Sequence, residues 1–150
     1  MSKAKVVTAT IRLVIPAGQA KPSPPVGPAL GQAGLKIMDF CKDFNAKTAD
    51  FKSDVPVPVV ITAFADKSFK WVMKTPPASY FIKKAAGMDS GSQRPGHQHV
   101  AAISLKHLHE IALVKQQDQP MVGLPSLVKS LMGTARSMGV RVVTRPEDAP

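Results

Sequence analysis

Cysteine is nearly absent from this sequence: Cys41 is the only one among 150 residues. A single cysteine excludes an intramolecular disulfide and any zinc site built from several cysteines, and it fits a reducing compartment. Long apolar runs are also missing, since none comes near the roughly 18 residues of a membrane-spanning helix. The N-terminus has no apolar segment of the kind found in secretory signals. We therefore expect neither a membrane protein nor a secreted protein held together by disulfides.

Acidic residues and large aromatic rings are scarce as well. The chain has 10 Asp and Glu against 20 Lys and Arg, a formal charge of +10, and one Trp and one Tyr. The basic excess is spread over both halves, with 11 basic and 5 acidic residues in 1–75 and 9 and 5 in 76–150. A field of this sign favours a nucleic acid or an anionic surface as partner. The hydrophobic content of 44% is enough for one domain or two small ones.

Catalytic and metal-binding motifs are lacking too. The sequence has no P-loop, no GxGxxG, no supported Ser-His-Asp order and no paired carboxylates in an apolar context. Its four histidines match no zinc spacing and have no carboxylate grouped with them; they are His97, His99, His107 and His109. Cys41 lies on the apolar stripe of a helix and is expected to be a core residue rather than a nucleophile. We predict a protein that is not an enzyme and that uses no metal or cofactor.

The first half has the pattern of a small α+β domain. Residues 6–15 alternate between apolar and polar side chains, as a strand with one buried face does. Residues 26–34 suit a short helix, and 36–47 a longer one, because Ile37, Phe40, Cys41 and Phe44 form one stripe. Residues 56–65 and 68–74 form a predicted β-hairpin, whose Phe69 and Trp71 are expected to pack in the core rather than to stack on bases. Residues 1–74 should therefore hold a three-stranded antiparallel sheet with helices.

A proline-rich segment from Pro22 to Gly34 interrupts this domain. Each proline fixes φ and disfavours helical geometry in the residue before it, so residues 22–25 should form a stiff, polyproline-like rod. Glycines at 27, 31 and 34 leave the backbone bare at near-helical spacing. The segment is either a rigid surface loop or a preorganised contact surface.

The second half begins after a proline boundary. Thr75, Pro76 and Pro77 should form the boundary between the domains, with a connection stiffened by two prolines, and apolar residues beyond them recur with helical spacing. Helices are predicted over 77–86, 105–117 and from about 125 to 138, with Ala78, Phe81, Ile82 and Ala85 as the buried stripe of the first. Short extended pieces are expected at 100–103 and 140–144. This gives a three-helix domain over 78–144 and a tail over 145–150.

Two segments of this second domain have the composition of a nucleic-acid contact. The loop 88–99 is polar and glycine-rich; it is either a solvated loop or a segment that orders against phosphates through serine hydroxyls, bare backbone and Arg94. Gly133 lies within a helix whose end carries Thr134, Arg136 and Ser137. Hydroxyls and glycines suit recognition of folded RNA by shape and 2′-OH better than reading of the DNA major groove.

Three classes of function remain open on these residues alone. The first is an RNA-binding structural protein. The second is a DNA-binding regulator that uses the three-helix domain as helix-turn-helix proteins do. The third is a protein-interaction module in which residues 22–28 are a ligand for an aromatic groove.

Five motifs follow one another through both halves of the chain. They are Pro22-Ser-Pro-Pro-Val-Gly-Pro-Ala-Leu-Gly-Gln32, Phe40-Cys-Lys-Asp-Phe-Asn45, Lys74-Thr-Pro-Pro77, Lys83-Lys-Ala-Ala-Gly87 and Gly133-Thr-Ala-Arg-Ser-Met-Gly139. In this order they resemble the motifs of the large-subunit ribosomal protein eleven family, whose members lie at the base of the ribosomal stalk. The resemblance leaves little of the chain unmatched.

The resemblance implies that the second domain binds the GTPase-associated region of large-subunit rRNA. The residues implied at that RNA are Lys83, Lys84, Gly87, Ser90, Gly91, Ser92, Arg94, Gly133, Thr134, Arg136, Ser137, Met138 and Gly139. It also implies a proline-rich segment that faces thiopeptide antibiotics and translational GTPases, through Pro22, Ser23, Pro24, Pro25, Gly27, Pro28 and Gln32. The implied partners are large-subunit rRNA, stalk ribosomal proteins and, transiently, translational GTPases. Neither a membrane nor a second copy of the chain is implied as a partner. The resemblance also implies that the first domain pivots about a hinge at Thr75, Pro76 and Pro77.

Some segments are more similar to mitochondrial members of the family than to bacterial ones. These are Arg94-Pro-Gly-His97, Leu105-Lys-His-Leu-His-Glu-Ile-Ala112 and Tyr80-Phe81. They favour a ribosome of the mitochondrial matrix; the alternative is the bacterial cytoplasm or another organelle.

Overall fold

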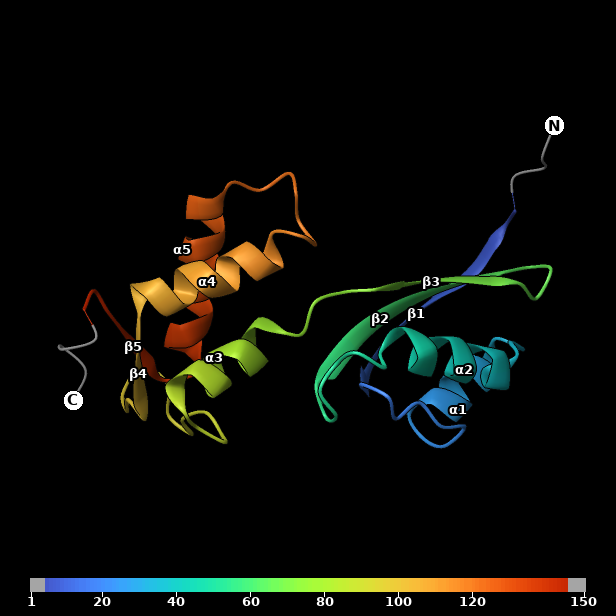
Figure 1. The fold of residues 1–150 in the computed structure, drawn as a ribbon, viewed down its shortest axis with the longest axis horizontal. Helices are drawn as coiled ribbons and strands as arrows, with labels where there is room; N and C mark the ends of the chain where they lie inside the picture. Colours follow the sequence, from blue (N-terminus) through green and yellow to red (C-terminus); the bar gives the residue numbers. More distant parts are fainter. Residues whose placement is uncertain (1–4, 146–150) are drawn as a thin grey trace. The chain divides into compact units, whose positions relative to one another are not determined.

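The computed structural model describes residues 5–145. The chain divides into two compact units, one ending at Pro76 and the other beginning at Pro77. The first unit contains β1 (Val7–Pro16), α1 (Val26–Gln32), α2 (Ile37–Lys47), β2 (Pro56–Phe64) and β3 (Phe69–Met73) (Figure 1). The second contains α3 (Ala78–Ala86), β4 (Ala101–Ser104), α4 (Leu105–Lys115), α5 (Leu124–Ser137) and β5 (Val140–Val143).

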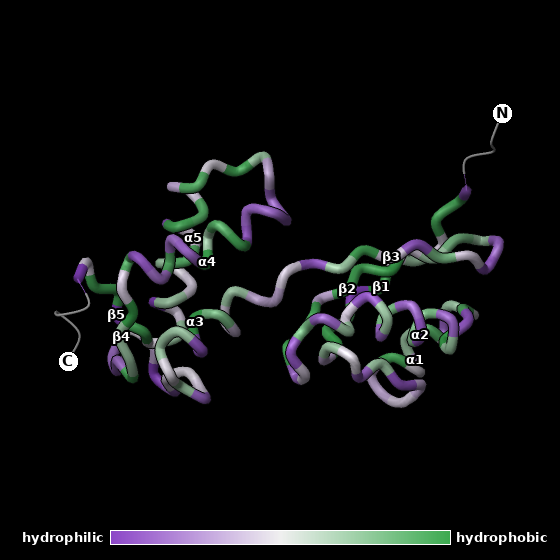
Figure 2. The backbone as a smooth tube through the Cα atoms, viewed as in Figure 1, coloured by the Kyte–Doolittle hydropathy of each residue, from purple (hydrophilic) through white to green (hydrophobic). Residues whose placement is uncertain are grey.

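The first unit is an antiparallel sheet of order β1-β2-β3 with α1 and α2 against one face (Figure 1). The register pairs Ile11 with Ile61 and Ile61 with Trp71, so that these side chains point to the same face. Figure 2 shows hydrophobic residues along the strands and hydrophilic ones at the turn between β2 and β3. The alternation read from the sequence thus produces one buried face, as predicted.

Aromatic rings fill the space between α2 and the sheet. Phe40 and Phe44 are fully buried, and the ring of Phe40 lies 5.5 Å from that of Trp71 in an edge-to-face arrangement. Phe69 also packs against this core, with 6.3 Å between its ring centroid and that of Phe40. The predicted core role of both aromatic residues of β3 is confirmed, and these rings fix the position of α2 on the sheet.

The second unit packs its three helices together with a two-stranded parallel sheet. Ile82 of α3, Leu108 of α4 and Ala135 of α5 are fully buried at its centre. β4 pairs with β5 from Ala101↔Val140 to Ser104↔Val143. The sequence indicated both extended pieces but not their pairing, because two parallel strands joined through helices carry no local signal such as a hairpin turn.

Helix ends follow their caps with small departures from prediction. Ser104 is the N-cap of α4, since its hydroxyl accepts the His107 N–H. Gly87 ends α3 in the left-handed region at φ 66°. Ala85 was predicted in the buried stripe of α3, but it is exposed, and Ala86 packs on the core instead. The inward position in the last turn is thus four residues after Ile82, not three.

Two further expectations concern the ends of elements. α4 stops at Lys115 rather than at Gln117, where the chain enters a run of turns. The predicted tail over 145–150 lies outside the described residues except for Arg145. No helix within residues 5–145 is long and apolar enough to cross a bilayer.

Candidate nucleic-acid interface

The polar loop 88–99 is held against the C-terminal end of α5. The N–H of Ser92 donates to the Met138 carbonyl at 2.9 Å, and the N–H of Val100 donates to the Gly139 carbonyl at 2.9 Å. These two bonds attach the first half of the loop to Met138 and the residue after the loop to Gly139, which follows Met138 in the chain. The segments 90–92 and 133–139, picked separately from the sequence, therefore form one continuous surface.

Two glycines allow this close contact. A Cβ on Gly139 would overlap the Ser92 Cβ and would lie 2.9 Å from the Gln98 carbonyl oxygen. Gly139 also has φ +76°, which disfavours any side chain. A Cβ on Gly91 would lie 3.3 Å from the Met138 carbonyl oxygen. Gly139 needs glycine because its backbone nearly touches loop 88–99, whereas a side chain at Gly91 would only crowd the Met138 carbonyl. Gly139 therefore has a structural reason in addition to any role at a ligand.

The loop is shaped by its own hydrogen bonds as well. The Ser92 hydroxyl accepts the Arg94 N–H at 3.1 Å. The Arg94 carbonyl then accepts the N–H groups of His97 and Gln98. The loop thus has a defined backbone at Ser92 and from Arg94 to Gln98, although its side chains are exposed from 93 to 99.

Gly133 has a different role from Gly139. It lies on the exposed side of α5, and no atom lies within 4 Å of the position that a Cβ would take. Nothing within the described protein requires a glycine there, although glycine costs a helix about 1 kcal/mol relative to alanine. A bare helix surface at this position is therefore open to a close neighbour from outside the unit.

The hydroxyl groups beside Gly133 are oriented by the helix itself. The Thr134 hydroxyl donates to the Ser130 carbonyl at 3.1 Å, and the Ser137 hydroxyl donates to the Thr134 carbonyl at 2.7 Å. Each hydroxyl hydrogen is used in the helix, so the oxygens present lone pairs outward as acceptors. These two acceptors are suited to the hydrogen of a ribose 2′-OH.

A groove of about 360 Å³ runs beside Gly133, between α5 and β5. Its apolar floor and cationic rim are formed by His99, Met132, Gly133, Arg136, Val140, Arg141 and Val142. Arg136 was predicted as a contact residue, whereas Arg141 was not. The signal for Arg141 was available in β5, where it is exposed between the partly or fully buried Val140 and Val142.

The end of α3 joins the same loop from its N-terminal side. The Met88 N–H donates to the Lys83 carbonyl at 3.0 Å, which closes the helix around Gly87. Lys84 is exposed, and its ammonium lies 5.9 Å from the Tyr80 ring centroid. Lys83 is half-buried. These lysines add positive charge at the point where loop 88–99 begins.

The proline-rich segment belongs to the first unit and is not a rod. Residues 22–25 form a turn with a cis peptide bond between Pro24 and Pro25, and the turn leads directly into α1. The Ser23 carbonyl accepts the N–H groups of Val26 and Gly27. The rod prediction was wrong because these two bonds to the Ser23 carbonyl close a turn, whereas a polyproline rod has no internal hydrogen bonds.

Side chains of α2 and its C-cap hold the loop that precedes this turn. Asn45 accepts the Ala20 N–H at 3.0 Å and donates to the Ala20 carbonyl at 3.2 Å. The Thr48 hydroxyl accepts the Gly18 N–H at 3.0 Å, and Thr48 as a residue is only 1% exposed. A Cβ on Gly27 would lie 2.8 Å from the Pro22 carbonyl oxygen. The segment is therefore rigid for reasons other than its prolines alone.

The predicted contact residues of this segment lie on an open surface. Pro22, Ser23, Pro24, Pro25, Pro28 and Gln32 are exposed, and Gly27 is half-buried. A shallow groove of about 260 Å³ lies beside the turn, lined in part by Ser23, Pro24 and Pro25.

Cys41 is a residue of the first core, as its place on an apolar helical stripe predicted. Burial raises the pKa of its thiol, so the reactive thiolate is disfavoured. Within residues 5–145 no three His, Cys, Asp or Glu side chains gather closely enough to hold a metal ion.

Family models match both units of the chain. Residues 11–69 match the model described as ribosomal protein L11, N-terminal domain. Residues 74–142 match the model described as ribosomal protein L11, RNA binding domain. The second match contains every residue of the surface built from the end of α3, loop 88–99 and the end of α5.

Proposed function

This chain belongs to the ribosomal protein L11 family, non-enzymatic proteins that bind rRNA at the stalk base of the large subunit, and we propose that its rRNA contact is the surface formed by loop 88–99 and the end of α5. The observation that carries this proposal is the pair of hydrogen bonds from Ser92 and Val100 to Met138 and Gly139. They join the two segments whose composition suits an RNA backbone. We call this surface the loop–helix surface, residues 90–94 and 133–139.

The chemistry of the loop–helix surface supports RNA rather than duplex DNA. The hydroxyl oxygens of Thr134 and Ser137 face outward as acceptors, and Gly133 lets a sugar-phosphate backbone approach the helix. Arg94 and Arg136 are both exposed and supply positive charge without a long row of base-reading side chains. A ribose 2′-OH is the group that distinguishes RNA at such a site. Lys83, Lys84 and Gly87 extend the same surface at the end of α3.

The test is the substitution Gly133→Leu in the full chain. Thermal stability should stay the same or rise slightly, because the position is open and leucine is the better helix former. Affinity for a folded rRNA fragment of the stalk base should fall at least about tenfold, because the added side chain occupies the space of the RNA backbone. Ser126→Leu, at the opposite end of α5 and also exposed, is the matched control. Unchanged RNA affinity in Gly133→Leu, or equal affinity of the native chain for duplex DNA, would contradict the proposal.

A second inference concerns the proline-rich segment as the edge that faces translational GTPases and thiopeptides. Its support is the rigid, exposed turn at residues 22–25, held through Asn45 and Thr48. Replacing Pro24 and Pro25 together by serine should leave rRNA affinity unchanged. The same change should weaken thiopeptide inhibition and lower factor-dependent GTP hydrolysis on large subunits rebuilt with the variant. Normal inhibition by the antibiotic would remove this inference.

The joint between the units is the third inference. We infer that Thr75, Pro76 and Pro77 form the hinge about which the first unit moves, since the division of the chain falls between the two prolines. Stalk ribosomal proteins are the inferred neighbours of the first unit. A spin-label distance distribution across the joint should be broad in the free chain and narrow on the subunit; the same width in both would refute the hinge.

The ribosome of mitochondria is the proposed setting. Its support lies only in sequence, in the segments 80–81, 94–97 and 105–112. The chain should co-sediment with large subunits from purified mitochondria. Its recovery only from bacterial or other organellar subunits would place it elsewhere.

A further inference from the structure

One face of the first unit's sheet has no covering element from that unit. Figure 1 shows α1 and α2 on the same side of the strands, the side to which the buried strand residues such as Ile15 and Ile61 point. The register and one main-chain bond set the outward side chains of three strands in rows. These rows are Thr10, Thr62 and Lys70; Arg12, Val60 and Val72; and Val14, Pro58 and Lys74. We call these nine residues the open face.

Apolar side chains occupy the middle of the open face. Val14 is 51% exposed and Val72 is 60% exposed, while Pro58 and Val60 on the central strand are half-buried. Together with neighbouring residues they line a shallow depression of about 660 Å³. The outward face of β1 was expected to be polar. The pairing of the three strands nevertheless places Val14 of β1 and Val72 of β3 on either side of Pro58 and Val60 of the central strand β2. Such a contiguous exposed patch is typical of a binding surface.

The charges around this patch all have one sign. Arg12, Lys70 and Lys74 are exposed, and no ion pair among the described residues involves any of them. β1, β2 and β3 contain no Asp or Glu. A complementary partner is therefore apolar along its centre and acidic along its flanks.

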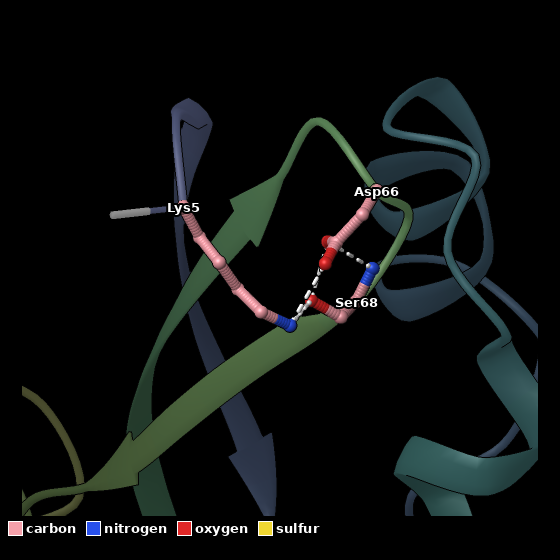
Figure 3. A network of polar contacts seen from close by, with 3 residues as sticks. All are labelled: Lys5, Asp66 and Ser68. Atoms are coloured by element: carbon pink, nitrogen blue, oxygen red, sulfur yellow. Dashed lines mark hydrogen bonds and ion pairs between the residues drawn. The ribbon is translucent and has the colours of Figure 1, made fainter. Parts of the chain in front are cut away.

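Nucleic acid fits the open face less well than protein does. Binding of unpaired bases to a sheet uses exposed aromatic rings, but the centre of this face is aliphatic. Phe64 points to the same side at the far end of β2, and the ammonium of Lys5 lies 5.7 Å from its ring centroid. The Lys5 ammonium is held by the Asp66 carboxylate at 2.8 Å and by the Ser68 hydroxyl at 2.9 Å. Figure 3 shows these contacts among the three side chains. This polar contact occupies the position where a base would stack on Phe64.

The size of the open face suits a helix. Its outer strands are about 10 Å apart, which matches the diameter of an α-helix of about 10–12 Å. Its three rows extend about 13 Å along the strands, enough for between two and three helical turns. We propose that the open face binds an acidic amphipathic helix of a partner protein. The apolar stripe of that helix lies on Val14, Val60 and Val72, and its carboxylates lie toward Arg12, Lys70 and Lys74.

The proposal is tested with the full chain and a defined probe. The probe is a synthetic peptide of about 14 residues, with leucines at helical spacing and glutamates on both flanks of the stripe. Fluorescence anisotropy should show saturable binding that weakens as salt is added. A peptide of the same composition in scrambled order should bind at least about tenfold more weakly, because it has no apolar stripe.

Substitutions then assign the binding to this face. Replacing Arg12, Lys70 and Lys74 together by glutamate should raise Kd about tenfold or more at low salt, since three screened ion pairs are lost and become repulsive. Val72→Ser should raise Kd several-fold at any salt concentration. The matched controls are Met38→Ser and Lys42→Glu on α2, which are exposed on the other side of the unit and should leave Kd unchanged.

Several outcomes would overturn the proposal. They are a lack of saturable binding, equal binding of the scrambled peptide, and control variants that weaken binding as much as the variants of the open face. Competition between the peptide and the rRNA fragment would assign the open face to nucleic acid, and this result would also overturn the proposal. Affinity for rRNA should be normal in every variant. The ribosomal assignment does not depend on this result.

Discussion

Replacing Gly139 by alanine should break the loop–helix surface from within. The new Cβ would overlap Ser92 and crowd the carbonyl oxygen of Gln98, and the residue would keep a left-handed φ of +76°. The left-handed backbone costs a non-glycine residue about 1–2 kcal/mol. Relief of the overlap moves the loop and weakens two main-chain bonds worth about 0.5–1.5 kcal/mol each. The second unit should therefore lose about 2–5 kcal/mol of its free energy of unfolding.

Urea denaturation of the full chain measures this loss unit by unit. Trp71 is the only tryptophan and lies in the first unit, so its fluorescence should show an unchanged transition. The part of the far-UV circular dichroism transition that belongs to the second unit should shift to lower urea. Hydrogen exchange of the Ser92 and Val100 amides should accelerate, because both donate to the affected residues.

A matched glycine separates the two parts of the cost. Gly87 has φ +66° but no atom within 4 Å of its Cβ position, so Gly87→Ala should cost only the backbone term. Ser92→Gly combined with Gly139→Ala should recover part of the loss, since it removes the Cβ that the alanine meets. If Gly139→Ala cost no more than Gly87→Ala and left both amides protected, the steric argument would be refuted.

Three further predictions concern single contacts. Asn45→Ala should lower the free energy of unfolding by about 1–3 kcal/mol, because the N–H and carbonyl of Ala20 lose their partner. Hydrogen exchange around residues 18–22 should accelerate, while rRNA affinity should not change. Unaltered exchange at these residues would contradict the prediction. Ser104→Ala should cost about 1 kcal/mol through loss of the α4 cap, measured by urea denaturation, while Ser104→Asp should retain most of the stability; an equal loss in both would refute the capping role. Bonds from Lys5 and Ser68 hold the pKa of Asp66 well below its ordinary value of 3.8. The contribution of this ionised carboxylate to folding stability is therefore complete above pH 3.8 and is lost as the pH falls below that value. NMR titration of the Asp66 carboxyl should show a midpoint below that of the Lys5→Met variant, and identical midpoints would contradict the pairing.

Periodicity was a good guide wherever one face of an element is buried. Strands of the first sheet, the stripe of α2 and the stripe of α5 could all be predicted, because each buries every second residue or one helical face. The parallel pairing of β4 with β5 could not be predicted, since its partners lie 39 positions apart, as Ala101 and Val140 do, and no local turn joins them. The predicted burial of Ala85 was wrong for a related reason. Positions three and four residues after Ile82 are both compatible with the inner face of a helix, and only tertiary packing selects Ala86 over Ala85.

The site divides in the same way. Composition alone indicated the loop 88–99 and the end of α5, and the structure joins them through bonds that leave no trace in sequence. The outward acceptors of Thr134 and Ser137 depend on where each hydroxyl hydrogen goes, which follows from helix geometry and not from residue type. The turn at residues 22–25 was missed because closely spaced prolines favour extended geometry locally, whereas the bonds that close the turn come from Val26 and Gly27.

The pairing of β4 with β5 sets the order in which the chain can become functional as it is made. The first unit has all its strands once Met73 has been synthesised. The second unit needs Gly139 and β5, its last element, before Val100 has an acceptor and β4 has a partner. Because synthesis runs from the N-terminus, about 40 more residues are added after loop 88–99 before the end of α5 exists to bind it. At typical synthesis rates this takes a few seconds. A chain interrupted before residue 138 would carry a complete first unit and a loop 88–99 that lacks both of its main-chain acceptors.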